Sequence, residues 1–247
     1  MPHLDDLPRH GWIACRKCLS PSETELRTGA WKVVNDPAAW GSSRPSVLVL
    51  GFSKGFTQSD AGRSGRFEDV PFKGMRPRLS ETLSALGVLN RGEDVTDRVA
   101  ATETELAFGS LVRCSLSRFN PKKQRLECTG AIMPKAFNEE VAPLVRNCGE
   151  TFLRRLPESL KLIVMLGTGD AYIAGCRALV QQLHSKSFAI VNDVAYRAGG
   201  VLWVHASHPS GLNGHHTSWM EGSPTDKQGR KRLLAQSAIG SVALSAA

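Results

Sequence analysis

The sequence lacks the long apolar segments of a membrane protein. None of its hydrophobic runs approaches the roughly 20 residues that cross a bilayer. Residues 1–6 do not show the basic-then-apolar pattern of a signal peptide. The chain also holds no internal repeat and no long low-complexity stretch. We therefore expect a soluble, cytoplasmic protein with no membrane partner.

The two common nucleotide-binding motifs are also missing. The turn Gly51-Phe52-Ser53-Lys54-Gly55 does not have the spacing of a P-loop, and no Gly-x-Gly-x-x-Gly follows a predicted strand. These absences disfavour a nucleotide-hydrolysing or dinucleotide-dependent enzyme. A glycine turn of this kind either cradles a phosphate through its backbone N–H groups or is a plain turn, and the sequence leaves both open.

Acidic residues are outnumbered by basic ones. The 247 residues include 31 Lys and Arg against 23 Asp and Glu, so the formal net charge is +8. Clustered basic side chains release counterions from phosphates, which favours a nucleic acid partner, although the same charge can serve solubility alone. With 41% hydrophobic and 22% charged residues, the chain is not disordered and can bury one good core or two small ones.

Short apolar runs alternate with helical patterns along the chain. The apolar runs predict strands at residues 46–50, 107–112, 160–167 and 201–207. Apolar residues at helical spacing predict helices at residues 79–86, 142–156, 170–184 and 227–243. The polar, basic stretch 115–127 indicates an exposed loop. We therefore predict an α/β fold, a three-layer α/β/α arrangement with a mostly parallel central sheet. A single domain should span residues 1–247, with residues 1–40 as an amino-terminal extension.

In open α/β sheets, ligands bind beyond the carboxyl ends of the strands. The loops after Leu50, Val112, Gly167 and Ser207 should therefore converge on one site. The last of these loops opens with His208-Pro209-Ser210, in which the proline stiffens the backbone beside the imidazole. We interpret His208 as a functional side chain rather than a merely solvated one.

Six cysteines in a chain without a signal pattern do not suggest a disulfide framework. Cys15-Arg16-Lys17-Cys18 is the notable spacing, because a Cys-x-x-Cys pair brings two thiolates within reach of one metal centre. Such a pair needs two further ligands from elsewhere in the chain. The alternative is that the cysteines are unrelated buried thiols, as we expect for Cys176.

Five motifs in order resemble the iron–sulfur branch of the uracil-DNA glycosylase superfamily. They cover most of residues 12–215. The motifs are Cys15-x-x-Cys18, the glycine loop Gly51 to Gly55, Pro71-Phe72-Lys73-Gly74, Ser110-Leu111-Val112-Arg113-Cys114, and His208-Pro209-Ser210. The resemblance implies a DNA glycosylase that excises uracil by hydrolysing the N-glycosidic bond, and excision of other deaminated bases is a further hypothesis. Its partner would be DNA containing such bases, and the protein would act as a monomer.

The resemblance also implies a metal centre. Its ligands would be Cys15, Cys18, Cys114 and Cys148, with Cys128 as the other candidate for the fourth position. Four thiolates suit either a [4Fe–4S] cluster or Zn²⁺, and the family favours the cluster. Its expected role is structural, since it would tie the amino-terminal arm to the loop after the second predicted strand.

Catalytic and base-binding roles follow from the same resemblance. His208 would stabilise the departing base, and Phe72 would stack on the base once it is flipped out of the duplex. The sequence departs from the family in the first loop, where Phe52 and Lys54 stand at the positions of a carboxylate and a proline. Ser110 also stands where an asparagine is expected to read the base, so a broader base range is a hypothesis.

Without the first-loop carboxylate, the water-positioning group is open. Ser53 and the carboxylates of Asp60, Glu68 and Asp69 are the candidates, and we choose Ser53 and Asp60. The base-binding set is Phe52, Phe72 and Ser110. The DNA-binding set is Lys54, Ser210, Leu212 and His215, in which Leu212 and His215 would lie where the family inserts a wedge into the minor groove. A metal-binding pair of His215 and His216 is the alternative for that segment.

Three rival functions remain. The protein could hold uracil-containing DNA without turnover, or be trapped on it covalently through a histidine in the loop after His208. It could instead use the Lys54 amine as a nucleophile at the sugar. It could also be a degenerate DNA-binding relative with no activity.

Overall fold

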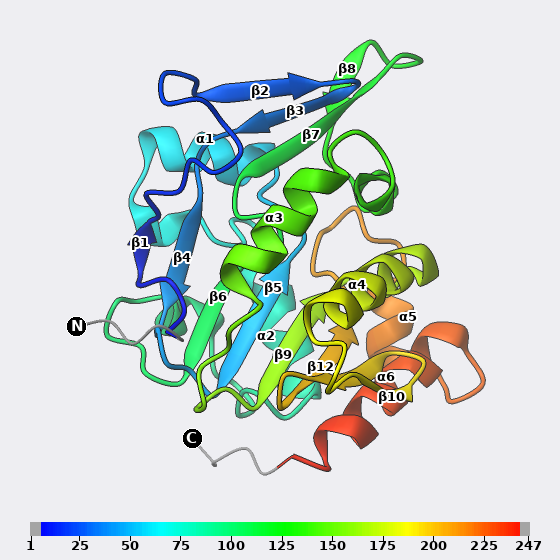
Figure 1. The fold of residues 1–247 in the computed structure, drawn as a ribbon. Helices are drawn as coiled ribbons and strands as arrows, with labels where there is room; N and C mark the ends of the chain where they lie inside the picture. The colour runs from blue at the N-terminus through cyan, green and yellow to red at the C-terminus, as the bar shows by residue number, and fades with distance from the viewer. Residues whose placement is uncertain (1–5, 243–247) are drawn as a thin grey trace.

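The computed structural model describes residues 6–242, which form an α/β fold with one large and one small sheet (Figure 1). The last residue of the helix predicted at 227–243 and the outermost residues of the predicted domain lie outside this range. The large sheet has eight strands, in the spatial order β1 (Gly11–Trp12), β4 (Ala38–Gly41), β6 (Leu106–Ser110), β5 (Val47–Gly51), β9 (Leu162–Leu166), β12 (Val201–Ala206), β11 (Ala195–Ala198) and β10 (Ala189–Asn192).

The centre of the large sheet is parallel and its two edges are antiparallel. Strands β6, β5, β9 and β12 run parallel to one another, whereas β1 and β4 at one edge and β10 and β11 at the other pair in antiparallel fashion. The central strands are buried along their whole length, as their continuous apolar sequences require. The predicted α/β class is therefore confirmed, with a mixed sheet.

The helices are α1 (Phe56–Ser64), α2 (Arg76–Ala85), α3 (Ala142–Phe152), α4 (Asp170–Leu183), α5 (His216–Glu221) and α6 (Lys227–Ile239). Side chains of α2 to α6 join two separate hydrophobic clusters. Leu48 and Leu50 of β5 join the cluster that includes α3 and α4, while Val47 and Val49 join the one that includes α2 and α6. This alternation follows from the two-residue period of a strand.

The segment predicted as an exposed loop at 115–127 is a β-hairpin, which corrects that prediction. Its strands β7 (Ser115–Asn120) and β8 (Arg125–Glu127) continue a small antiparallel sheet with β2 (Glu25–Thr28) and β3 (Trp31–Val34). The small sheet lies above the large one in Figure 1. The basic residues of this segment indicate a loop when the sequence is taken alone, but exposed strands also tolerate basic residues well.

The predicted amino-terminal extension is built into both sheets. Within residues 6–41, β1 and β4 form one edge of the large sheet, and β2 and β3 form half of the small one. The structure also contains the short 3₁₀ helices Phe67–Asp69, Val95–Arg98 and Met133–Phe137. None of the helices between residues 6 and 242 combines the length and apolar character that crossing a membrane would require.

Candidate functional site

The carboxyl ends of the four parallel strands meet at one edge of the large sheet. Hydrogen bonds join the loops that follow them: the Leu111 N–H donates to the Gly51 carbonyl at 2.9 Å, and the Gly167 N–H donates to the Ala206 carbonyl at 2.7 Å. Val112 N–H donates to the carbonyl of Phe52 at 2.8 Å. The loops predicted to converge therefore lie side by side, as strand topology requires.

His208 lies in the loop directly after β12 and is held as a neutral imidazole. Burial, together with the neighbouring His216, lowers the pKa of His208 to about 4. Its Nδ1 lies 3.2 Å from the Ser210 backbone nitrogen, which donates a hydrogen bond to it. In a neutral ring whose Nδ1 accepts, Nε2 carries the proton. The loop thus presents His208 as a hydrogen-bond donor through Nε2.

Asn213 stabilises this loop through hydrogen bonds to other residues of the same loop. Its Nδ2 donates to the carbonyl of His208 at 2.7 Å and to the Ser207 hydroxyl at 3.0 Å, while its Oδ1 accepts from the His215 N–H at 3.1 Å. A second brace comes from α2, because Arg78 Nη1 donates to the Ser210 carbonyl at 2.9 Å. Sequence reasoning missed both residues, although asparagine side chains often hydrogen-bond nearby backbone groups in turns.

The tip of the same loop is apolar and exposed. Leu212 is 87% exposed, the highest value among the exposed large hydrophobic side chains. His215 is exposed as well, whereas His216 is buried with neither ring nitrogen hydrogen-bonded. The adjacent histidines therefore point into different surroundings, which does not favour a shared metal ion. An exposed leucine on a braced loop is available to a partner.

Phe72 has a left-handed backbone, with φ at +54°. Only Gly, Asn and Asp adopt this conformation easily, so a buried phenylalanine here carries backbone strain. Its ring packs edge-on against Phe108 at 6.1 Å and lies beside the end of β5, where a Cβ on Gly51 would be 3.9 Å from Phe72 Cε1. The strained turn thus holds this ring next to the strand ends.

The Phe52 and Lys54 side chains point into the protein. The Phe52 ring is part of the core, with edge-on contacts to Phe137 at 5.5 Å and Tyr172 at 6.0 Å. Lys54 is 2% exposed, donates to the Arg113 carbonyl, and lies 3.4 Å from an Asp36 oxygen. These placements correct two expectations: the Phe52 ring does not face a base, and the Lys54 amine reaches neither a DNA phosphate nor a sugar.

Asp36 is the carboxylate that sequence reasoning missed. Besides Lys54, it accepts from the Ser115 N–H at 2.7 Å and the Ser115 hydroxyl at 2.6 Å, so it joins three segments beneath the first loop. No sequence motif includes Asp36, because its partners lie far from it in the sequence. Asp60, chosen from the sequence, is exposed on α1. The Ser53 hydroxyl lies 3.8 Å from Met133 Sδ, and Ser110 is buried at the end of β6.

The four cysteines expected to bind metal come from three segments that lie together. The turn with Cys15 and Cys18 contacts α3, because Lys17 Nζ donates to Thr151 Oγ1 at 3.2 Å and Asn147 Nδ2 lies 3.7 Å from Cys18 Sγ. Cys148 is buried in the same helix, and Cys114 follows β6. We call these four residues the cysteine site.

Electrostatic interactions link the members of the cysteine site. Burial is the main cause that raises the pKa of Cys148 to about 11; a backbone hydrogen bond from Arg113 opposes this rise, and Cys18 and Cys15 contribute to it. Burial, then Cys148, raise the pKa of Cys114 to about 12. Within residues 6–242, no three His, Cys or acidic side chains are arranged as a metal site. The thiols are therefore neighbours that would have to lose protons and draw closer to ligate a metal.

The other two cysteines lie elsewhere. Cys128 packs against the first loop, where a Cβ on Gly55 would be 3.4 Å from its Sγ. Burial raises its pKa, and its nearest charged neighbour is Glu127. Cys176 is fully buried in α4 beside Tyr172. Of the two candidates for the fourth ligand, Cys148 is the one that interacts with the other three cysteines.

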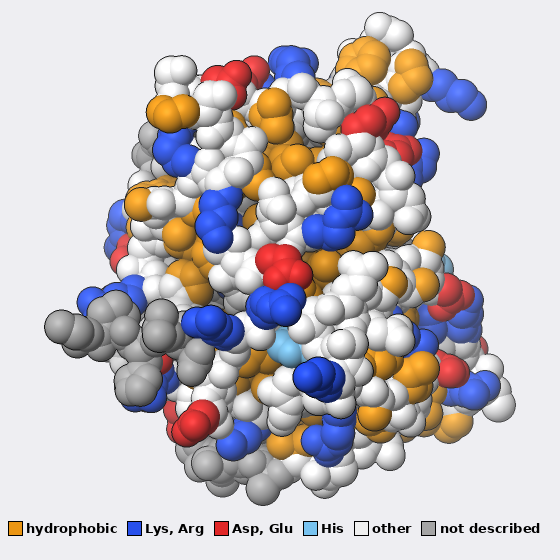
Figure 2. All heavy atoms as spheres, viewed as in Figure 1, with side chains coloured by type: hydrophobic (Ala, Val, Ile, Leu, Met, Phe, Trp, Pro, Cys, Tyr) orange, Lys and Arg blue, Asp and Glu red, His pale blue; other side chains and the backbone are white. Residues whose placement is uncertain are grey.

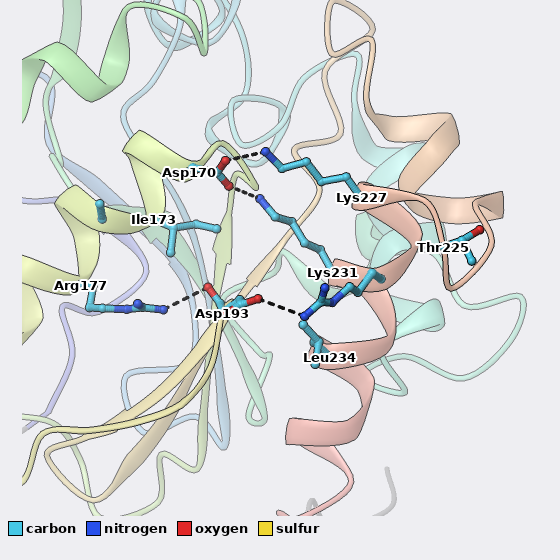
Figure 3. Close-up of a pocket in the computed structure, with 10 residues that line it drawn as sticks. Asp170, Ile173, Arg177, Asp193, Thr225, Lys227, Lys231 and Leu234 are labelled. Atoms are coloured by element: carbon cyan, nitrogen blue, oxygen red, sulfur yellow. Dashed lines mark hydrogen bonds and ion pairs between the residues drawn. The ribbon is translucent and has the colours of Figure 1, made fainter.

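A cavity of about 590 Å³ opens between α4 and α6 (Figure 3). Asp170 there binds Lys227 at 2.6 Å and Lys231 at 2.5 Å, and Lys231 also donates to the Thr168 carbonyl at 2.6 Å. These hydrogen bonds lower the pKa of Asp170 to about 2. Its charged groups are largely paired with one another, so we interpret the cavity as a clamp that holds α6 on the loop after β9.

Basic side chains are distributed over the surface. In the view of Figure 2, Lys and Arg are interspersed with acidic and apolar groups and do not form one continuous patch. Part of the basic charge is neutralised locally, as in the pair of Arg118 and Glu139 at 2.7 Å. The net charge therefore does not locate a nucleic acid interface on this face by itself.

No protein-family model matches this chain, and no curated protein matches its sequence. Any assignment of function therefore depends on the residues themselves and on their geometry.

Proposed function

We propose that the protein is a DNA glycosylase that removes uracil, and other deaminated bases, from DNA. The observation that carries the proposal is His208, a neutral imidazole at the end of a central parallel strand whose Nε2 is left as a donor. The alternative of a DNA-binding protein without turnover uses the same surface. The enzyme would work as a cytoplasmic monomer.

His208 has the properties that base release requires. Hydrolysis breaks the bond between C1′ of the sugar and a ring nitrogen of the base, and a water oxygen forms the new bond to C1′. Negative charge develops on the base as it departs, and a fixed donor in a partly dry site stabilises that charge. A neutral imidazole donates through Nε2 without first having to be protonated. The released water proton ends on the base or on solvent.

The base would lie between Phe72 and Ser110. The Phe72 ring is 5% exposed and packs in the core beside the end of β5, so a base could stack on it only after the ring is uncovered; Ser110 ends the adjacent strand β6. A single hydroxyl can donate or accept one hydrogen bond at a time, whereas an amide side chain offers both. This geometry supports a broader base range than a strict uracil reader has.

The site has fewer groups suited to activating water than to stabilising the departing base. The first loop contributes Ser53, whose hydroxyl is half-buried, and no carboxylate. Asp36 is committed to Lys54 and Ser115, and Asp60 is exposed on α1. We therefore assign the larger share of the rate to charge stabilisation by His208 and keep Ser53 as the group that positions water.

The loop after β12 would also contact the DNA backbone and the stacked bases. Leu212 stands exposed at the tip, with Ser210 and His215 on either side of it. An apolar wedge that enters the base stack lowers the cost of flipping a nucleotide out. Because Asn213 and Arg78 hold the loop, the wedge and His208 would act as one rigid unit.

The three-layer arrangement typical of uracil-DNA glycosylases is part of this proposal. It is supported by the two hydrophobic clusters, one with α3 and α4 and the other with α2 and α6. A [4Fe–4S] cluster at the cysteine site belongs to it too, with Zn²⁺ as the alternative. The four residues fit such a group because soft thiolates suit both metals. The bound centre would supply a structural cross-link rather than chemistry at the sugar.

A base-release assay tests the proposal. End-labelled oligonucleotides carrying one uracil, hypoxanthine or xanthine, as single strands and as duplexes, are incubated with the protein and then cleaved with alkali at abasic sites. We expect strand breaks with uracil and with at least one other base. A protein–DNA adduct that survives denaturation would favour covalent trapping instead. Binding without release of any base would overturn the glycosylase assignment.

A further inference from the structure

Arg113 is buried without an ionic partner. It is 2% exposed, and its Nε and Nη1 have no hydrogen-bond partner in the part of the chain that the structure describes. The guanidinium stacks over the Phe152 ring of α3 at 5.4 Å. On its other side is β6, where a Cβ on Gly109 would lie only 1.8 Å from Nη1. The glycine therefore leaves the space that the guanidinium fills.

A buried charge without a partner is strongly unfavourable, because desolvation of an ion is not recovered by packing. The other buried cation nearby, Lys54, has its counterion in Asp36 at 3.4 Å. Arg113 is thus the unbalanced positive charge of this region. Such a group in a folded protein indicates an anion that binds beside it.

The cysteine site lies next to this charge. Arg113 precedes Cys114 in the chain, its backbone N–H bonds to Cys148, and its guanidinium interacts electrostatically with Cys148. Neutral thiols supply no negative charge. Four thiolates around Zn²⁺ or around a [4Fe–4S]²⁺ core carry a net charge of about −2. An anionic centre would therefore supply the charge that Arg113 lacks.

We propose that Arg113 is the buried countercharge of a metal–thiolate centre formed by Cys15, Cys18, Cys114 and Cys148. This inference rests on the metal centre of the proposed function and not on the glycosylase reaction. Arg113 is a positioning residue that acts through charge: it stabilises the thiolates once the metal is bound. Without metal, the same side chain destabilises the fold.

The proposal predicts that one substitution, Arg113→Met, has opposite effects in the metal-free and the metal-bound protein. Arg113→Met fills the same space without charge, so the metal-free protein should unfold at a higher temperature than the wild type. The metal-bound variant should show a smaller thermal gain on loading and should lose most of its metal during dialysis against a chelator. Arg113→Lys retains the charge and should keep most of the metal.

The experiment uses the full chain, purified without oxygen, then stripped and reloaded with ferrous iron and sulfide or with Zn²⁺ alone. Metal and sulfide analysis, visible absorption and thermal unfolding are measured for wild type, Arg113→Met and Arg113→Lys. Equal metal retention in wild type and Arg113→Met would overturn the role of Arg113 and leave the glycosylase proposal standing. Destabilisation of Arg113→Met in both states would mean a packing role only. A wild type that binds neither metal would overturn this inference and the metal centre together.

Discussion

The loop after β12 and the cysteine site, of which Cys114 follows β6, differ in how far the protein alone satisfies their polar groups. In the loop, the His208 ring nitrogen, the His208 carbonyl and the Ser210 carbonyl all have hydrogen-bond partners within 3.2 Å. Beside the cysteine site, Nε and Nη1 of the Arg113 guanidinium have no hydrogen-bond partner within residues 6–242, and burial raises the pKa of Cys114 and Cys148.

Under the proposed function, the loop would need no added component, whereas the cysteine site would need its metal. A preorganised loop needs no rearrangement when its ligand arrives, so its geometry indicates function directly. A region with an unbalanced buried charge indicates something that must be added. Four substitutions, three in the loop after β12 and one in the cysteine site, can break or sharpen the contrast.

Loss of the His208 side chain should have the largest effect. His208→Ala removes the donor to the departing base, so the single-turnover rate of base release should fall on the order of 10²–10⁴-fold, with DNA affinity nearly unchanged. Because the pKa of His208 is lowered to about 4, wild-type activity should not fall as the pH drops through the ordinary range of histidine. His215→Ala is the control and should weaken binding more than it slows release. An unchanged rate in His208→Ala would contradict the assignment.

The second test compares two cysteines. Cys148→Ser should abolish stable metal binding and lower the yield of folded protein, because Cys148 interacts with the other three members of the site. Cys128→Ser should keep its metal, since Cys128 packs against Gly55 instead. Metal content per chain and visible absorption are the measurements. Metal loss in Cys128→Ser, with retention in Cys148→Ser, would reverse the choice of the fourth ligand.

A smaller effect is expected at Asn213. Asn213→Asp keeps the acceptor for the His215 N–H but removes the amide that donates to His208 and Ser207. Loss of these hydrogen bonds should cost about 1–2 kcal/mol in positioning His208, which is roughly a tenfold fall in rate. Base-release kinetics and metal content are measured together. A fall in metal content would show that the loop and the cysteine site are not independent.

The smallest change in stability is expected at Leu212. Since the side chain is 87% exposed, Leu212→Ala should alter the free energy of unfolding by less than about 0.5 kcal/mol. Release from duplex DNA should nevertheless fall several-fold, with release from single strands unchanged. Leu233→Ala, an exposed leucine on α6, is the matched control. An equal fall on both substrates would argue against a wedge.

Local patterns predicted most of the central fold. The four parallel strands and helices α2, α3, α4 and α6 appear where apolar periodicity indicated them, because burial on both faces leaves a strong signal. The hairpin at 115–127 and strands β10 and β11 were not predicted. The hairpin is largely polar and partly exposed, and β10 and β11 are only four residues long, so these segments lack a strong apolar pattern and become strands through the hydrogen bonds of a neighbouring strand.

The sequence by itself determined three features: which loops follow the parallel strands, the His-Pro-Ser turn and the cysteine spacing. All three depend on residues close together in the chain. Only the tertiary structure decided that Lys54 is paired with Asp36, that Asn213 and Arg78 hold the His208 loop, and that Arg113 lies uncompensated beside Cys148. Burial and ionic pairing join residues far apart in sequence, so no local pattern records them.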